Sequence, residues 1–231
     1  MQLRIKTSAR FPLEGVDWER KLLLGGATGL LLELLFVGLA YLASEEAAFG
    51  IAPLVVSLNF PALGYILEVY RGTLLLEAGA LPEWRNWPGL LRNGVATFAV
   101  GLAYGVIPML LLLFGLGLLV KGGMLLFLGM VLMVLGVLAG VFMLFFLPMA
   151  LARYLVQRRI EVAFHPGILW EGINAVLAEY VATYLLSVGC YILAGLIAAL
   201  PYVGPLVWPF VWFYLMLVQA RLFGEICAKA P

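Results

Sequence analysis

The chain has 231 residues, of which 65% are hydrophobic and only 12% are charged, and its net charge is +1. Soluble domains carry about 25% charged residues, which they need to cover their surface. The composition therefore excludes a soluble enzyme, and the near-neutral charge leaves no basic surface for nucleic acid. It predicts an all-α integral membrane protein that is surrounded by membrane lipids.

Six apolar segments are long enough to cross a bilayer, which takes about 20 residues of helix. In chain order they are residues 22–43, 51–76, 94–120, 122–156, 177–200 and 203–226. The second segment is interrupted around Asn59 and Pro61. A polar segment precedes the first one, which we interpret as an uncleaved span rather than a signal peptide. We expect a single membrane domain over residues 1–231.

Basic residues are distributed unevenly around these six spans. Of the 14 Lys and Arg residues, all except Lys121 lie in the terminal segments, in the two longer loops or at the span ends next to them. Basic residues are enriched on the cytoplasmic side of membrane proteins. We therefore predict a multi-pass protein of the cytoplasmic (inner) membrane with both termini in the cytoplasm. The three outer turns are short, and the first, residues 44–50, holds Glu45 and Glu46.

The segments that lead into the odd-numbered spans resemble one another. In each, an aromatic or histidine residue precedes a glycine by seven positions: Trp18 and Gly25, Trp87 and Gly94, His165 and Gly172. This pattern predicts three parallel helical hairpins, at about residues 11–76, 82–160 and 163–228, each preceded by a short interfacial amphipathic helix. Parallel repeats imply a pseudo-symmetry axis along the membrane normal. The alternative is that Trp, Pro and Gly simply cluster at the membrane interface.

Three tryptophans, Trp18, Trp84 and Trp87, lie in these lead-in segments. Trp84 and Trp87 are three residues apart, so we expect them to share a helical face or turn. Tryptophan prefers the headgroup region of a bilayer, which predicts interfacial anchoring. The alternative is a docking surface for a cytoplasmic protein partner.

Polar side chains within the spans are candidates for function. Glu33 lies near the middle of the first span, and Asn59 is expected at a similar depth in the second. A hydrogen bond between them is plausible on this spacing. One interpretation is a proton or ligand site, and the other is a protonated Glu33 that holds two helices together.

Arginines end the three even-numbered spans: Arg71, Arg158 and Arg221. If the repeats are symmetric, these side chains converge on one cytoplasmic opening, where they would bind an anion or anionic lipid headgroups. The alternative is ordinary snorkelling of arginine to the interface. Glu68 precedes Arg71 by three residues and can pair with it on a helix.

Residues for catalysis or metal binding are scarce. The chain has one histidine, His165, and two cysteines, Cys190 and Cys227, whose predicted depths differ too much for a disulfide. These residues cannot assemble a usual zinc or iron site, and the sequence contains no HExxH, GxSxG, Walker or SxxK motif. We therefore expect no metal, no cofactor and no enzymatic activity.

Glycines spaced four residues apart predict sites of close helix packing. The pairs are Gly25 with Gly29, Gly101 with Gly105, and Gly136 with Gly140. Each pair would allow a neighbouring helix to approach its backbone.

The run LPEWRNW, residues 81–87, resembles the LPEWxNW loop of a prokaryotic multi-pass membrane family, catalogued as domain of unknown function 4013. Residues 59–65 (NFPALGY) and 218–224 (VQARLFG) are also similar to that family. The third lead-in segment departs from the aromatic pattern at His165. The resemblance implies a six-span prokaryotic membrane protein and no particular activity.

Two functional hypotheses remain from the sequence. The first is a non-enzymatic membrane subunit or scaffold, within a membrane complex or a homo-oligomer. The second is a permease or channel for a lipid, an amphiphile or a small ion, with Glu33 and Asn59 lining the path.

Overall fold

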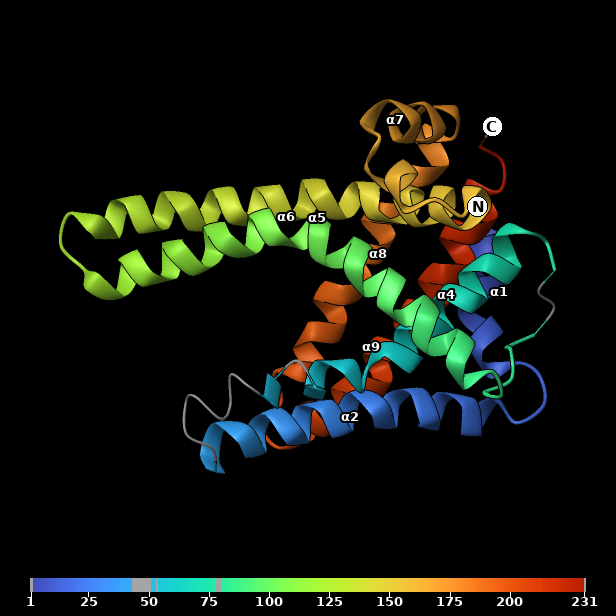
Figure 1. Ribbon diagram of the computed structural model, residues 1–231, viewed down its shortest axis with the longest axis horizontal. Coiled ribbons are helices and arrows are strands. Elements are labelled where there is room, and N and C mark those ends of the chain that lie inside the picture. Colours follow the sequence, from blue (N-terminus) through green and yellow to red (C-terminus); the bar gives the residue numbers. More distant parts are fainter. Residues whose placement is uncertain (1, 43–50, 53, 78–79, 231) are drawn as a thin grey trace. The chain divides into compact units, whose positions relative to one another are not determined.

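The computed structural model describes residues 2–42, 51–52, 54–77 and 80–230. In these ranges the chain forms helices and turns and contains no strand, which confirms the all-α prediction (Figure 1). In chain order the elements are α1 (Gln2–Arg10), η1 (Phe11–Leu13), α2 (Trp18–Leu42), α4 (Phe60–Leu74), α5 (Trp87–Lys121), α6 (Leu125–Gln157), η2 (Ile160–Phe164), α7 (Pro166–Ala175), α8 (Leu177–Ala198) and α9 (Val203–Cys227). The turn predicted at residues 44–50 lies outside the described residues.

Five of the described helices, α2, α5, α6, α8 and α9, are long and apolar enough to cross a membrane. They coincide with five of the six predicted spans. The remaining one, residues 51–76, is divided, because Leu58 and Asn59 form a turn and α4 begins at Phe60. Pro61 lies in the first turn of α4, where its missing N–H leaves no helical hydrogen bond unmade. The 15 residues of α4 rise about 22 Å, less than the ~30 Å of a bilayer core.

The chain divides into two compact units. The first unit comprises Met1–Thr97 and Gly172–Pro231, and the second comprises Phe98–Glu171. Helices α5 and α7 pass from one unit into the other. The predicted single domain and the three repeats remain predictions.

Helix α9 is the centre of the first unit, where it contacts α1, α2, α4 and α8. Phe213 and Leu217 of α9 are fully buried. Gly25 of α2 lies against the ring of Phe213 so closely that a Cβ atom there would overlap the ring, and a Cβ at Gly29 would lie 3.0 Å from Pro209. The glycine pair predicted in the first span is therefore confirmed as a helix-packing site.

Helix α4 makes a second close contact in this unit, with the first turns of α5. A Cβ atom at Gly64 would overlap the carbonyl oxygen of Leu90, and one at Gly94 would overlap the carbonyl oxygen of Phe60. Two backbones thus meet directly at two glycines. These contacts keep α4 enclosed by protein, and Tyr65, like most of its large side chains, is buried.

Helices α5 and α6 form an antiparallel hairpin, whose turn contains Gly122 and Gly123 at φ values of 68° and 61° (Figure 1). Glycine reaches this left-handed region without steric cost. Along the hairpin, a Cβ at Gly129 would lie 2.9 Å from the Gly115 oxygen, and one at Gly136 would lie 2.9 Å from Leu112. The close packing predicted from Gly136 is therefore confirmed.

The packing predicted for Gly101 and Gly105 is not made within the second unit. No described atom of that unit outside the backbone of their own helix lies within 4 Å of a Cβ built at either glycine. Spacing alone selects a helical face, but it does not specify whether another helix of the same chain reaches that face.

The amphipathic helix predicted at the start of the first repeat is wrong. Residues 11–13 form a 3-10 turn and residues 14–17 are not helical, whereas α1 precedes them. The backbone explains the break, since Gly15 and Asp17 have φ values of 100° and 57°. Neither conformation continues a right-handed helix.

Candidate functional site

The loop at residues 81–87 is attached to the helices of the first unit by a buried lysine. Lys21, in the first turn of α2, is only 6% exposed. Its Nζ donates a hydrogen bond to the Leu81 carbonyl oxygen at 3.0 Å and lies 2.8 Å from Oε1 of Glu83. Because a buried ammonium is costly unless its hydrogen bonds are satisfied, Lys21 and this loop stabilise each other.

Aromatic packing fixes the same loop from a second side. The Tyr65 hydroxyl of α4 donates a hydrogen bond to the Pro82 carbonyl oxygen at 2.8 Å. The rings of Tyr65 and Trp84 are stacked, with centroids 4.3 Å apart and planes 9° from parallel. Phe213 of α9 lies 5.9 Å from the Tyr65 ring and 6.3 Å from the Trp84 ring. We call Lys21, Tyr65, Glu83, Trp84 and Phe213 the loop clamp.

The end of the loop starts the next helix. Asn86 caps α5, since its Oδ1 accepts a hydrogen bond from the Gly89 N–H at 3.1 Å. Arg85, the position that the LPEWxNW pattern leaves open, is exposed. The run thus contains side chains that hold the loop, cap a helix or face outward.

Electrostatics supports the clamp. The hydrogen bond from Lys21 lowers the pKa of the Glu83 carboxyl below its ordinary value of 4.5, and the nearby charges of Arg85 and Arg20 act in the same direction. Glu83 therefore stays ionised and paired with Lys21 at neutral pH.

The structure separates the three predicted anchor tryptophans. Trp84 is part of the loop clamp, and its Nε1 is buried without a hydrogen-bond partner among the described residues. Trp87 is 45% exposed, and its ring lies 5.8 Å from that of Trp84, which confirms that the two share one turn. Trp18 begins α2 and is half-buried. Trp87 is thus the most available of the three for an anchoring or docking role.

Glu33 lines a cleft of about 400 Å³ in the first unit. The other lining residues come from α2 and from the region where α8 ends and α9 begins: Leu32, Phe36, Val37, Ala198, Pro205 and Trp208. Asn59 is not among them, and its Oδ1 is buried without a hydrogen-bond partner in the described part of the chain. The expected hydrogen bond between Glu33 and Asn59 is therefore not made, and the cleft is an apolar site with one carboxyl group.

The predicted arginines lie in different surroundings. Arg71 lies 3.9 Å from Glu68, as its spacing predicted. Arg221 pairs with Glu225 at 2.8 Å and lies over the Phe11 ring at 4.6 Å. Because these residues belong to the first unit and Arg158 belongs to the second, the convergence of three arginines remains a prediction.

The residues that sequence reasoning missed are Lys21, Tyr65 and Phe213. From the sequence, Lys21 is one of several basic residues that indicate the membrane orientation, and the two aromatic residues belong to apolar spans. Lys21 and Leu81 are 60 positions apart, and Tyr65 and Pro82 are 17 positions apart, so no local pattern signals these contacts. Among the described residues no three His, Cys, Asp or Glu side chains are grouped so that they could hold a metal ion, and no disulfide joins Cys190 to Cys227.

Five membrane-length apolar helices and a loop built into their packing define an all-α, multi-pass membrane protein. The chain belongs to the protein family of unknown function DUF4013, whose model matches residues 47–203. This match confirms the resemblance drawn from the sequence. No curated protein and no solved structure matches the chain.

Proposed function

We propose that the protein is a non-enzymatic subunit or scaffold of a prokaryotic cytoplasmic membrane. In this proposal it has six spans arranged as three parallel hairpins, and both termini lie in the cytoplasm. Its partner is another membrane protein or a second copy of the chain, which binds the hairpin of α5 and α6.

The open glycine pair on α5 carries the proposal. Gly101 and Gly105 are spaced four residues apart, and no described atom of the second unit outside the backbone of their own helix lies within 4 Å of a Cβ at either position. Pairs of small residues at this spacing are a common docking site for a second helix in membranes. The surrounding helix surface is apolar and exposed, as at Leu102 and Val106.

The polar loop supports the same proposal. Lys21, Glu83 and Tyr65 are used in holding the loop against the helices. Side chains that maintain packing in this way are not available for proton transfer or nucleophilic attack. Their engagement favours a structural role for this edge of the protein.

The test compares two sets of glycine substitutions in chains with two different affinity tags, co-expressed at native level. Gly101→Leu combined with Gly105→Leu would block the pair, whereas Gly117→Leu changes another α5 glycine with open space around its Cβ. We expect the double variant to lower co-purification of the second tag, or of a membrane partner identified by mass spectrometry, by about tenfold, and Gly117→Leu to leave it unchanged. Recovery of wild-type chains only as monomers in several mild detergents would contradict the proposal.

A second candidate function rests on the Glu33 cleft. Ionisable residues within spans often mark transport paths, and this cleft supports a permease or channel for an amphiphile, a lipid or a small ion. The apolar lining disfavours sugars and amino acids. Flux through proteoliposomes that contain wild type, Glu33→Gln or Asn59→Ala tests this candidate. Loss of flux in Glu33→Gln alone would support it, and equal flux in all three would exclude Glu33 from the path.

A further inference from the structure

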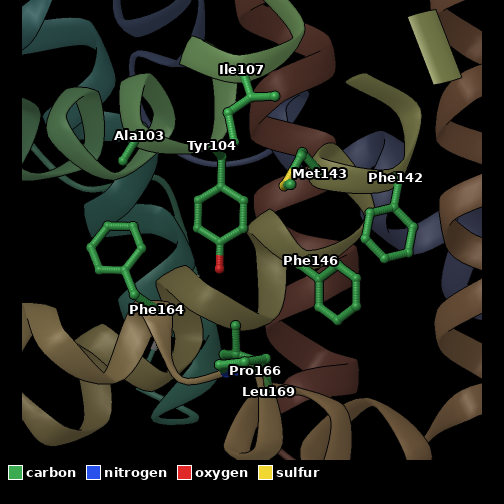
Figure 2. Close-up of a pocket in the computed structure, with 9 residues that line it drawn as sticks. All are labelled: Ala103, Tyr104, Ile107, Phe142, Met143, Phe146, Phe164, Pro166 and Leu169. Atoms are coloured by element: carbon green, nitrogen blue, oxygen red, sulfur yellow. The ribbon is translucent and has the colours of Figure 1, made fainter. Parts of the chain in front are cut away.

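A cavity of about 320 Å³ lies within the second unit, where the close contact between α5 and α6 ends (Figure 2). Toward the hairpin turn, glycines keep the two helices together, and the last such contact is between Gly140 and Pro108, at 3.6 Å from a Cβ built on the glycine. The cavity begins immediately beyond this point, at Ile107 and Phe142.

Three segments line the cavity. Helix α5 contributes three residues at positions i, i+1 and i+4, helix α6 contributes three at the same spacing, and the segment of η2 and α7 closes one side. These residues are Ala103, Tyr104, Ile107, Phe142, Met143, Phe146, Phe164, Pro166 and Leu169. The shared spacing means that each helix turns one face to the cavity, and Figure 2 shows the four aromatic rings around it.

Tyr104 is the single polar side chain in the lining, and its hydroxyl already donates a hydrogen bond. Its hydroxyl donates to the Ala163 carbonyl oxygen at 2.6 Å, and its ring lies 5.8 Å from that of Phe164. Water in the cavity finds few polar partners. The cavity is open to the surface at Ile107, Phe142 and Phe164, which are about half exposed. The cavity is therefore suited to hydrocarbon.

The neighbourhood of the cavity indicates the source of that hydrocarbon. Helices α5 and α6 are long and apolar enough to cross a membrane, so lipids are the molecules that surround them. Arg158 follows α6 directly and has a left-handed backbone conformation. From there the chain continues through η2, which contacts α6, to Phe164 in the cavity lining. The six residues that lead from Arg158 to Phe164 span at most about 21 Å. A phospholipid whose acyl chain enters the cavity can therefore place its headgroup at Arg158.

We propose that this cavity binds one acyl chain of an anionic phospholipid, whose phosphate group is held by Arg158. The apolar lining favours contact with a hydrocarbon chain, and the Arg158 guanidinium pairs most strongly with a phosphate whose charge no choline ammonium offsets. This site is independent of the proposed subunit role, because it does not involve Gly101 or Gly105.

The experiment uses the full chain in lipid nanodiscs with photoactivatable phosphatidylglycerol that carries a diazirine on one acyl chain. The same acyl chain on phosphatidylcholine distinguishes an anionic from a zwitterionic lipid. Labelled peptides are mapped by mass spectrometry, and we expect label to concentrate on residues 103–107 and 142–146 rather than on the hairpin tip. Ala103→Phe fills the cavity, and Leu113→Phe is the matched control at an exposed α5 position outside the lining.

We expect Ala103→Phe to reduce the label at these residues by at least about tenfold, because several methylene groups lose their burial, and Leu113→Phe to leave it unchanged. Ile107→Trp serves as a second filling variant if Ala103→Phe does not fold. Arg158→Gln should reduce labelling by phosphatidylglycerol down to the level of phosphatidylcholine. Uniform labelling along the hairpin, or equal labelling of Ala103→Phe and Leu113→Phe, would overturn the acyl-chain site. An unchanged preference in Arg158→Gln would overturn the role of the arginine.

Discussion

The two units of the chain pack their helices by different means. In the first unit, α4 and α9 are enclosed by protein, and aromatic rings, a buried lysine and two backbone contacts at glycine connect them to their neighbours. In the second unit, α5 and α6 meet along a seam of glycines, and most of their large apolar side chains are exposed. Lipid is as apolar as leucine, so a hairpin in a membrane gains little from hiding such side chains. The comparison indicates that the first unit combines close backbone approach with specific polar and aromatic contacts, whereas the second unit depends on close approach at glycine.

The largest effect is expected where two backbones touch in the first unit. Gly64→Ala places a Cβ on the carbonyl oxygen of Leu90, which cannot rotate away as a side chain can. We expect a loss of about 3 kcal/mol in the free energy of unfolding, measured by denaturant unfolding in lipid–detergent micelles. The control is Gly117→Ala in α5, which has open space at its Cβ and should gain up to about 1 kcal/mol from helix propensity. Equal stabilities of the two variants would contradict the backbone contact.

The next effect tests the polar part of the loop clamp. Lys21→Met keeps the apolar stem but leaves the buried Leu81 carbonyl without its donor. We expect a loss of about 2 kcal/mol, measured in the same way. Arg20→Met changes an exposed neighbour and should alter stability by less than about 0.5 kcal/mol. If Lys21→Met were as stable as Arg20→Met, the lysine would not hold the loop.

A smaller effect is expected in the second unit, where few polar contacts exist to be lost. Tyr104→Phe removes the hydroxyl that donates to the Ala163 carbonyl and should cost about 1 kcal/mol. Tyr202→Phe, at a 90% exposed position, is the control and should have no measurable effect. Hydrogen exchange at residues 160–164 should rise in Tyr104→Phe only. Unchanged exchange would show that the hydroxyl does not hold η2.

The smallest effect concerns pH. The pKa of Glu83 is lowered from 4.5 by its hydrogen bond with Lys21. A carboxyl whose folded pKa is depressed stabilises the folded chain above its unfolded pKa, and this contribution is lost as the pH falls through the folded value. The melting temperature of wild type should therefore exceed that of Glu83→Gln at pH 7, and the difference should shrink as the pH falls below 4.5. A constant difference between pH 7 and pH 3 would contradict the ion pair.

Much of the fold is predictable because apolar length is a local property. The first and the third to sixth predicted spans agree with α2, α5, α6, α8 and α9. The interruption predicted in the second segment is confirmed, since a turn at Leu58 and Asn59 precedes Pro61 in the first turn of α4. Composition does not distinguish a helix that faces lipid from one that is enclosed by protein, because both are apolar.

The candidate sites likewise divide into features that local spacing predicts and features that depend on tertiary contacts. The Glu68 and Arg71 pair was predicted because its partners are three residues apart on one helix. Glu33 and Asn59 do not make the expected hydrogen bond with each other. Equal predicted depth in the membrane does not specify which helix faces are in contact. The residue type of Trp84 predicts an anchor at the membrane interface. Its stacking on Tyr65 depends instead on how α4 meets the loop.

By itself, the sequence determined that this is an all-α membrane protein, where its long helices lie and which family it belongs to, because hydrophobicity and short motifs are written in consecutive residues. The tertiary structure alone decided that the LPEWRNW loop is held by Lys21, Tyr65 and Phe213. It also decided that one glycine pair packs, while another has no described neighbour within its own unit. It also decided that a cavity opens between α5 and α6. The reason is physical: in an apolar environment every helix face is acceptable, so the pairing of faces follows from shape and from a few buried polar contacts that are distant in sequence.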